Sequence, residues 1–122
     1  MSLPGSSARR LALAAFVLLA VLVVWGSLIR LETAGGGQWD KLQHFTAYAA
    51  LTALGFIARG RRSWTLLTAV AALGAGVEVL QAAMPLGRTG SFLDLAANLT
   101  GVMTVWAVWT AVETARSRRA RT

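Results

Sequence analysis

The chain contains no cysteine and few charged residues. Its 122 residues include two prolines and one histidine, and only 14% are charged against 56% hydrophobic. The absence of cysteine excludes disulfides, thiolate metal sites and cysteine nucleophiles. Soluble domains are about 45–50% apolar and about 25% charged, so this composition does not suit a soluble enzyme or a disordered chain. The scarcity of charge therefore indicates a small integral membrane protein.

Four stretches are apolar over a length that suits a membrane crossing. A helix needs about 20 mostly apolar residues to cross the hydrocarbon core, with about 17–25 tolerated. The predicted spans are residues 11–29, 42–58, 64–84 and 92–112, joined by short loops. The sequence thus predicts an all-α membrane protein with four transmembrane helices in one domain, residues 1–122.

The first stretch has some features of a secretory signal, because Arg9 and Arg10 precede its apolar run. The run exceeds the about 7–15 residues of a usual signal core, and three more spans follow it. We therefore expect a retained membrane helix, while cleavage near Ala34 stays open.

Basic residues gather on one side of the predicted topology. With the N-terminus inside the cell, nine fall on the cytoplasmic side and three outside. The cytoplasmic ones are Arg9, Arg10, Arg59, Arg61, Arg62, Arg116, Arg118, Arg119 and Arg121; the outer ones are Arg30, Lys41 and Arg88. Cytoplasmic loops carry an excess of Lys and Arg, so both termini are predicted to be cytoplasmic. The net charge of +7 therefore needs no nucleic-acid partner, and anionic lipid headgroups suit it better.

Helix-capping patterns support these boundaries. Asp40 with Gln43, and Ser91 with Asp94, match the capping box that opens a helix. Ser63 is a candidate N-cap for the third span.

Polar residues of three spans lie at the same predicted depth, near the outer surface. They are Asp40, His44 and Tyr48 on the second span, Glu78 and Gln81 on the third, and Asp94 and Asn98 on the fourth. Within each helix they are three or four residues apart, which places them on one face. Arg88 lies in the outer loop between the last two spans. Ionisable residues at membrane depth are costly and are therefore candidates for a functional site.

Small residues accompany the polar ones on the third and fourth spans. Gly74, Gly76, Ala97 and Gly101 lack bulky side chains, which lets helices approach closely in a membrane. We therefore expect close helix packing beside the polar residues.

Three of these segments resemble motifs of the VanZ-like family. Residues 40–45, Asp-Lys-Leu-Gln-His-Phe, with Tyr48 following, resemble the motif of its second helix. Residues 78–81, Glu-Val-Leu-Gln, resemble the Glu-x-x-Gln element of its third helix. The family's Arg-turn-Asp-x-x-x-Asn-x-x-Gly segment is matched by Arg88, Ser91, Asp94, Asn98 and Gly101.

The resemblance covers residues 40–101, and the first span and arginine-rich tail match only in general character. Gln43 departs from the pattern, because many relatives have an apolar residue there. Family members are small bacterial membrane proteins, and the named member gives low-level resistance to the glycopeptide teicoplanin. The resemblance therefore implies a location in the bacterial inner membrane and a cell-envelope function, with glycopeptide tolerance as the expected phenotype. It supplies no mechanism.

Three functions remain open. The first is binding, in which an outer-facing polar pocket holds an anionic lipid, a lipid-linked cell-wall intermediate or a glycopeptide. The candidate binding residues are Asp40, Tyr48, Gln81, Arg88, Asp94 and Asn98. The second is a membrane-embedded enzyme acting on a lipid-linked substrate, with His44 and Glu78 as acid and base and Arg88 stabilising negative charge. The third is a small assembly factor whose polar residues only specify helix packing.

Ordinary structural roles compete with these functions. Helix capping alone explains Asp40 and Asp94. Interhelical hydrogen bonds explain Gln81 and Asn98. Tyr48 also suits a membrane interface, where its ring is buried and its hydroxyl is wet.

No metal ligand set is predicted. A buried pair with His44 or Arg88 is the structural alternative for Glu78. Zinc usually takes more nitrogen or sulfur than one histidine supplies. An oxygen site made from Asp40, Glu78 and Asp94 has no diagnostic spacing. The cofactor and the oligomeric state do not follow from the sequence.

Overall fold

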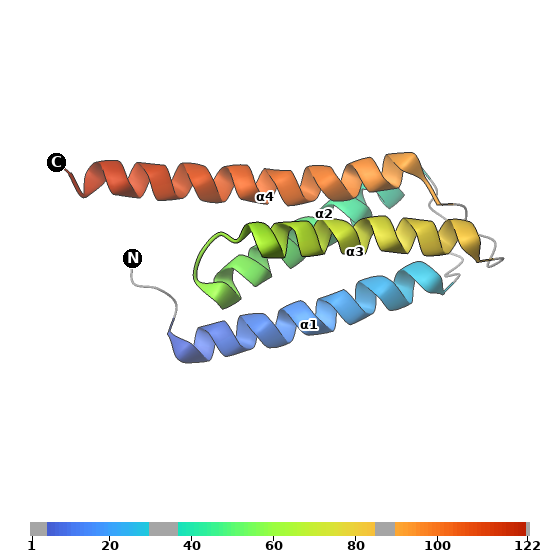
Figure 1. The fold of residues 1–122 in the computed structure, drawn as a ribbon, viewed down its shortest axis with the longest axis horizontal. Coiled ribbons are helices and arrows are strands. Elements are labelled where there is room, and N and C mark those ends of the chain that lie inside the picture. The colour runs from blue at the N-terminus through green and yellow to red at the C-terminus, as the bar shows by residue number, and fades with distance from the viewer. Residues whose placement is uncertain (1–4, 30–36, 85–89, 122) are drawn as a thin grey trace.

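The computed structural model describes residues 5–29, 37–84 and 90–121. These residues form four α-helices: α1 (Ser6–Leu28), α2 (Gln38–Arg59), α3 (Trp64–Ala83) and α4 (Phe92–Arg119). The helices alternate in direction along one axis, so the start of α1 and the end of α4 lie at the same end of the bundle (Figure 1). The predicted all-α fold of four helices is confirmed.

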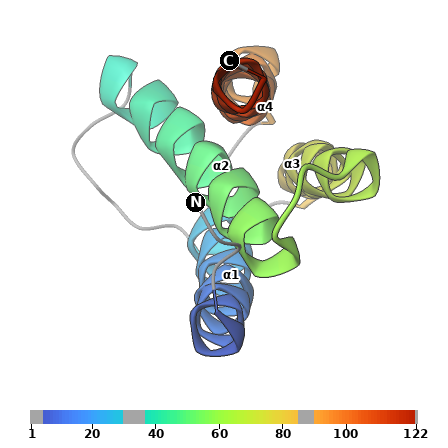
Figure 2. The same ribbon diagram turned by 90° about the vertical axis from the view of Figure 1, so that its left-hand side faces the viewer.

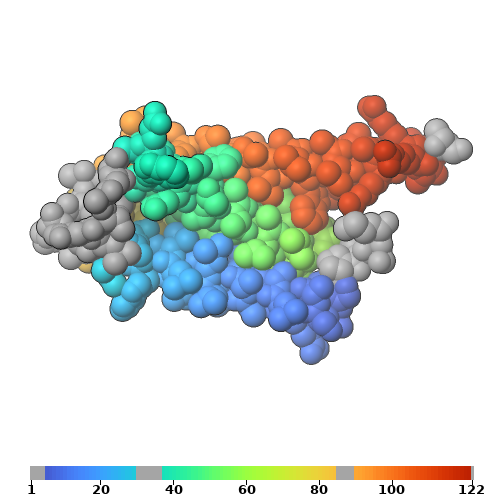
Figure 3. Space-filling view, turned by 180° about the vertical axis from the view of Figure 1, so that it is seen from behind, coloured from blue at the N-terminus to red at the C-terminus, as the bar shows by residue number. Residues whose placement is uncertain are grey.

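The second helix occupies the centre of the bundle. It crosses the others obliquely (Figure 2) and contacts α1, α3 and α4. On the face shown in Figure 3, α2 fills the space between α1 and α4. Leu51 and Phe56 of α2 are fully buried and form the core with Val70 and Val102. Within the described part of the chain, α1 packs on α2 and α3 only.

Three helices, α1, α3 and α4, are long and apolar enough to cross a membrane. These three helices support a multi-pass membrane protein. The predicted span 42–58 forms a helix, but α2 falls short of the same apolar criterion. The physical reason is the polar start of α2, where Asp40, Lys41, Gln43 and His44 lie within two turns.

The helix boundaries agree with most of the capping predictions. The Ser63 hydroxyl accepts a hydrogen bond from the Leu66 N–H at 3.3 Å, and the Ser91 hydroxyl accepts one from the Asp94 N–H at 3.3 Å. The prediction of Asp40 as an N-cap is wrong. Gly37, whose φ of 105° suits glycine, precedes α2, and Asp40 lies in the first turn. There its carboxylate complements the positive end of the helix dipole.

The fourth helix continues past the predicted end at residue 112 to Arg119. Residues 113–119 are charged or polar except for Ala115, yet Ala, Glu and Arg form helices well. Arg116, Arg118 and Arg119 lie in the last turn, where positive charge complements the helix dipole.

Two of the predicted close contacts between helices are confirmed and one is wrong. A Cβ at Gly101 would collide with the backbone carbonyl of Phe45 and lie 3.0 Å from the Ala49 nitrogen, so α2 and α4 touch there. A Cβ at Gly74 would lie 3.0 Å from the Tyr48 ring. By contrast, no described atom beyond its own helix lies within 4 Å of a Cβ built at Gly76, which faces outward.

The end of the bundle where α1 begins and α4 ends is rich in arginine. Polar and aromatic contacts connect the helices there. Arg62 pairs with Glu113 at 2.8 Å and lies over the Trp106 ring at 5.1 Å. Trp109 donates to Glu113 at 2.9 Å, and Phe56 meets both indoles edge-on. These contacts hold the α2–α3 connection against α4.

Candidate functional site

The opposite end of the bundle carries the polar residues identified in the sequence. We call seven of them the polar cluster: Asp40, Lys41, His44, Tyr48, Glu78, Asp94 and Asn98. They come from α2, α3 and α4, and the contacts described below join them across the three helices. The prediction that polar residues of three helices meet at one end is confirmed.

An ion pair connects α2 to α4. Lys41 Nζ lies 2.6 Å from Asp94 Oδ1, and the lysine side chain is 34% exposed whereas that of Asp94 is buried. This hydrogen bond raises the pKa of the Lys41 ammonium, so the lysine stays charged. The sequence interpretation treated Lys41 as a basic residue of the outer side and as part of the family-like motif, and it did not predict the pairing with Asp94.

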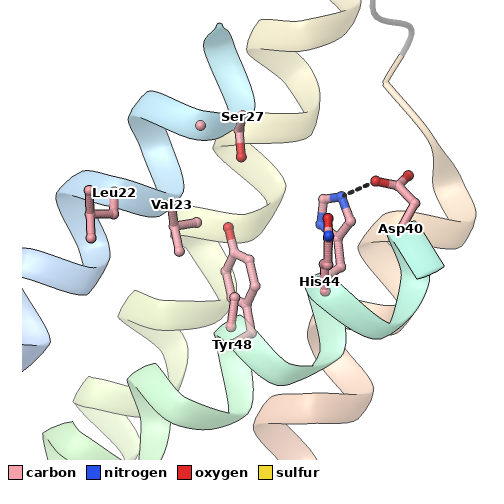
Figure 4. Close-up of a pocket in the computed structure, with 9 residues that line it drawn as sticks. Leu22, Val23, Ser27, Asp40, His44 and Tyr48 are labelled. Carbon is pink, nitrogen blue, oxygen red and sulfur yellow. Dashed lines mark ion pairs between the residues drawn. The ribbon is translucent and has the colours of Figure 1, made fainter. Parts of the chain in front are cut away.

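His44 lies at the centre of the polar cluster. Its Nδ1 is 3.0 Å from Asn98 Oδ1 and 4.0 Å from Glu78 Oε1. Its Nε2 is 3.9 Å from Asp40 Oδ1 and 3.9 Å from Asp94 Oδ2. Figure 4 shows the His44 ring beside Tyr48, with Asp40 one turn away on the same helix. Oxygen atoms of four side chains thus surround the imidazole.

Glu78 connects α3 to the start of α4. Its Oε2 accepts a hydrogen bond from the backbone N–H of Ser91 at 2.9 Å. Its Oε1 is buried and has no hydrogen-bond partner among the described residues. One oxygen of this carboxylate is therefore used structurally, and the other remains available.

Three buried polar atoms of the cluster have no hydrogen-bond partner within the described chain: Tyr48 Oη, Glu78 Oε1 and Asn98 Nδ2. Tyr48 and Asn98 are each 1% exposed, and both lie against Gly74. A buried polar atom without a partner costs about 1–3 kcal/mol, so three together call for an explanation. A bound polar ligand, ion or water would remove this cost.

A cleft of about 190 Å³ between α1 and α2 leads to the cluster (Figure 4). Its α1 wall includes Leu22, Val23 and Ser27, and its α2 wall includes the polar residues Asp40, His44 and Tyr48. One side of the cleft is therefore mainly apolar, and the other carries candidate functional groups.

Gln81 has a different surrounding from the other candidates. Its Nε2 donates to the backbone carbonyl of Ser27 at 2.8 Å. That carbonyl belongs to the last turn of α1, where no further helical N–H is available. Gln81 thus makes an interhelical hydrogen bond, which the sequence analysis gave as its structural alternative to ligand binding.

Arg88, the predicted anion-binding residue, lies outside the described residues, as does the cleavage site considered near Ala34. Without Arg88, the described charges of the cluster are three carboxylates and one ammonium. The arrangement thus favours a cation or hydrogen-bond donors.

One atom from each of Asp40, His44 and Asp94 lies within 4.8 Å of the other two, a set that could hold a metal ion.

No family model matches the chain, and no curated protein or solved structure is detectably similar to it. The resemblance to the VanZ-like family therefore stays a prediction from the motif residues.

Proposed function

We propose that the chain is a VanZ-like protein of the bacterial inner membrane with a cell-envelope function. All four helices cross the membrane in this proposal, with α2 shielded by its neighbours, and both termini are cytoplasmic. The separation of charge supports this orientation, because Arg9, Arg59, Arg62 and Arg116 lie at the end opposite the polar cluster. The polar cluster then opens toward the outer leaflet.

The function that the site supports best is ligand binding in the polar cluster. The observation that carries it is the set of buried polar atoms without partners, Tyr48 Oη, Glu78 Oε1 and Asn98 Nδ2, beside the cleft. An anionic lipid headgroup or a lipid-linked cell-wall intermediate is the proposed ligand, and glycopeptide tolerance is the proposed phenotype. Because the described cluster holds three carboxylates against one ammonium, which Asp94 already pairs, an anionic ligand needs positive charge from Arg88 or from a bound cation.

The test compares tolerance to teicoplanin in a susceptible Gram-positive host that expresses the wild type or single variants. Tyr48→Phe removes only a hydroxyl that has no internal partner, so it should fold normally and lose tolerance. Glu113→Gln, at the arginine-rich end, is the matched control and should keep it. Full tolerance with Tyr48→Phe, at equal membrane levels, would contradict the binding proposal.

Ligand affinity gives a second test of binding. Arg88→Ala should weaken the binding of polyprenyl phosphate in detergent micelles. Glu78→Gln keeps two polar atoms that can bond to a ligand and to the Ser91 N–H, so it should be tolerated. The reverse pattern would count against a binding role in which Arg88 holds the anion.

A membrane-embedded enzyme is the second candidate. The observation that favours it is the position of His44, with a Glu78 oxygen 4.0 Å from one ring nitrogen and Asp94 3.9 Å from the other. Such an imidazole could move a proton between a substrate and a carboxylate. If His44→Gln and Glu78→Gln are both stably expressed and leave the phenotype intact, this candidate is excluded.

The third function, a small assembly factor, attributes the cluster to packing alone. The bonds from Lys41 to Asp94 and from Gln81 to Ser27 favour it, because each joins two helices. It predicts that His44→Gln and Glu78→Gln lose much of their thermal stability. A binding site or an active site predicts instead that these variants lose function with only small losses of thermal stability.

A further inference from the structure

Three atoms that carry lone pairs converge within the polar cluster. His44 Nε2 lies 3.9 Å from Asp40 Oδ1 and 3.9 Å from Asp94 Oδ2. One ligand atom from each residue lies within 4.8 Å of the other two. We propose that Asp40, His44 and Asp94 bind a divalent transition-metal ion of the zinc type.

Oxygen atoms lie near both ring nitrogens of His44. Nδ1 lies 3.0 Å from Asn98 Oδ1, with Glu78 Oε1 a further acceptor at 4.0 Å. Both oxygens can accept from an Nδ1–H, and in that tautomer Nε2 has a lone pair available for a metal. Nε2 then faces one oxygen each of Asp40 and Asp94, so a cation placed between these three atoms would have all of them as ligands.

A second, independent observation comes from Glu78. Its side chain is 8% exposed, and Oε1 has no hydrogen-bond partner among the described residues while facing the His44 ring. Histidines that bind metals almost always donate their other N–H to a carboxylate or carbonyl oxygen. Asn98 and Glu78 supply such oxygens here, and Lys41 orients Asp94 through the oxygen that does not face His44.

The charge of the cluster also suits a divalent cation. Asp40, Glu78 and Asp94 against Lys41 leave a net charge of −2 among the described side chains when His44 is neutral. Glu78 and Asp94 are buried, and buried charges are costly unless they are paired or coordinate a metal. An ion of charge +2 would neutralise the set.

The ligand types favour zinc over magnesium. The imidazole nitrogen suits zinc, whereas magnesium prefers six oxygens. Three protein ligands leave a fourth position open, as in catalytic zinc sites, although this set supplies one nitrogen and two carboxylates where those sites usually have more nitrogen or sulfur. Tetrahedral zinc places neighbouring ligand atoms about 3.3 Å apart, so small side-chain rotations would close the 3.9 Å separations. Asp40 and His44 line the cleft, which gives the ion a route of entry.

The inference concerns metal binding and goes beyond the proposed function, although a bound cation would also help an anionic headgroup to enter the acidic cluster. The test is therefore made without lipid ligand or antibiotic, so its failure and that of the proposed function are distinguishable. His44 is the only histidine and the chain has no cysteine, so a protein without a polyhistidine tag has no competing imidazole or thiolate.

The experiment titrates Zn²⁺ into chelator-treated, detergent-solubilised full-length protein against a competing zinc indicator. We expect one Zn²⁺ per chain, with affinity lowered by more than about 100-fold in His44→Gln and Asp40→Asn. Glu113→Gln, which removes a carboxylate at the other end, should bind as the wild type does.

Co²⁺ in place of Zn²⁺ gives a direct readout of coordination, since its visible absorption depends on the ligands. The wild type and Glu113→Gln should give the same spectrum, and His44→Gln that of the free ion. Asp40→Asn is the second ligand variant. Because the Asp40 side chain is 25% exposed, its replacement should disturb folding less than the replacement of His44. The proposal is overturned if the folded wild type binds no zinc, or if both ligand variants bind it as tightly as Glu113→Gln does.

Discussion

The carboxylate of Glu78 accepts a hydrogen bond from the backbone N–H of Ser91 at 2.9 Å. In a capping box, that N–H would bond to the side chain three residues into the helix, which here is Asp94. Because Glu78 of α3 takes this position, the Asp94 carboxylate is free to pair with Lys41 at 2.6 Å and to face His44. One hydrogen bond between helices thus makes a capping residue part of the candidate site.

Replacing Glu78 should therefore destabilise the start of α4. Glu78→Ala leaves the Ser91 N–H without its acceptor and should cost about 1–3 kcal/mol in unfolding free energy. Glu78→Gln keeps a carbonyl acceptor and should cost less. Thermal unfolding in detergent measures both, and equal losses would contradict this role of the carboxylate.

The contact between α2 and α4 depends on Gly101. A methyl group there would collide with the Phe45 carbonyl, so Gly101→Ala should lower stability by about 1–3 kcal/mol. Gly76→Ala is the matched control, because nothing described outside its helix lies within 4 Å of the added carbon. It should leave the melting temperature unchanged or raise it, since alanine favours a helix by about 1 kcal/mol over glycine. Similar losses in both variants would show that the contact at Gly101 is not decisive.

Asn98 should affect metal binding without being a ligand. Asn98→Leu removes the acceptor that lies 3.0 Å from His44 Nδ1 and should weaken Zn²⁺ binding by about 10–100-fold. Asn98→Asp keeps an acceptor oxygen and should bind at least as tightly as the wild type. Zinc titration of the two folded variants checks this, and equal affinities would argue against orientation of the ring by Asn98.

The cysteine-free chain allows a direct test of orientation. In the proposed topology, Trp39→Cys lies outside the cell and Arg61→Cys lies inside, and both positions are exposed. A membrane-impermeant maleimide should label the first in intact cells and the second only after permeabilisation. The opposite pattern would reverse the whole topology.

The pair of Arg62 with Glu113 should add little stability, which makes Glu113→Gln a suitable control. The two side chains are 36% and 39% exposed, and ion pairs of this kind contribute about 0–1 kcal/mol. Glutamine also keeps an oxygen that can accept from Trp109. A loss above about 2 kcal/mol in thermal unfolding would contradict this expectation.

The sequence by itself determined the four helices and the end of each helix at which its polar residues lie. Hydropathy and helical spacing are properties of neighbouring residues, so they predicted four helices and placed His44, Glu78 and Asp94 at one end. They could not predict that α2 is central, because burial by other helices is not encoded in its own polar composition. They also predicted Asp40 as a cap, although Gly37 precedes the helix.

Only the tertiary structure decided which atoms meet. Bonds such as Glu78 to Ser91, Lys41 to Asp94 and Gln81 to Ser27 depend on how each helix is rotated and how helices cross. Gly101 and Gly76 are both small residues on apolar helices, yet only Gly101 touches a neighbouring backbone. The VanZ-like resemblance and the proposed ligand stay predictions. The physical reason for the division is that position in the chain specifies depth along a helix and local periodicity specifies the face, while partner choice requires the relative orientation of whole helices.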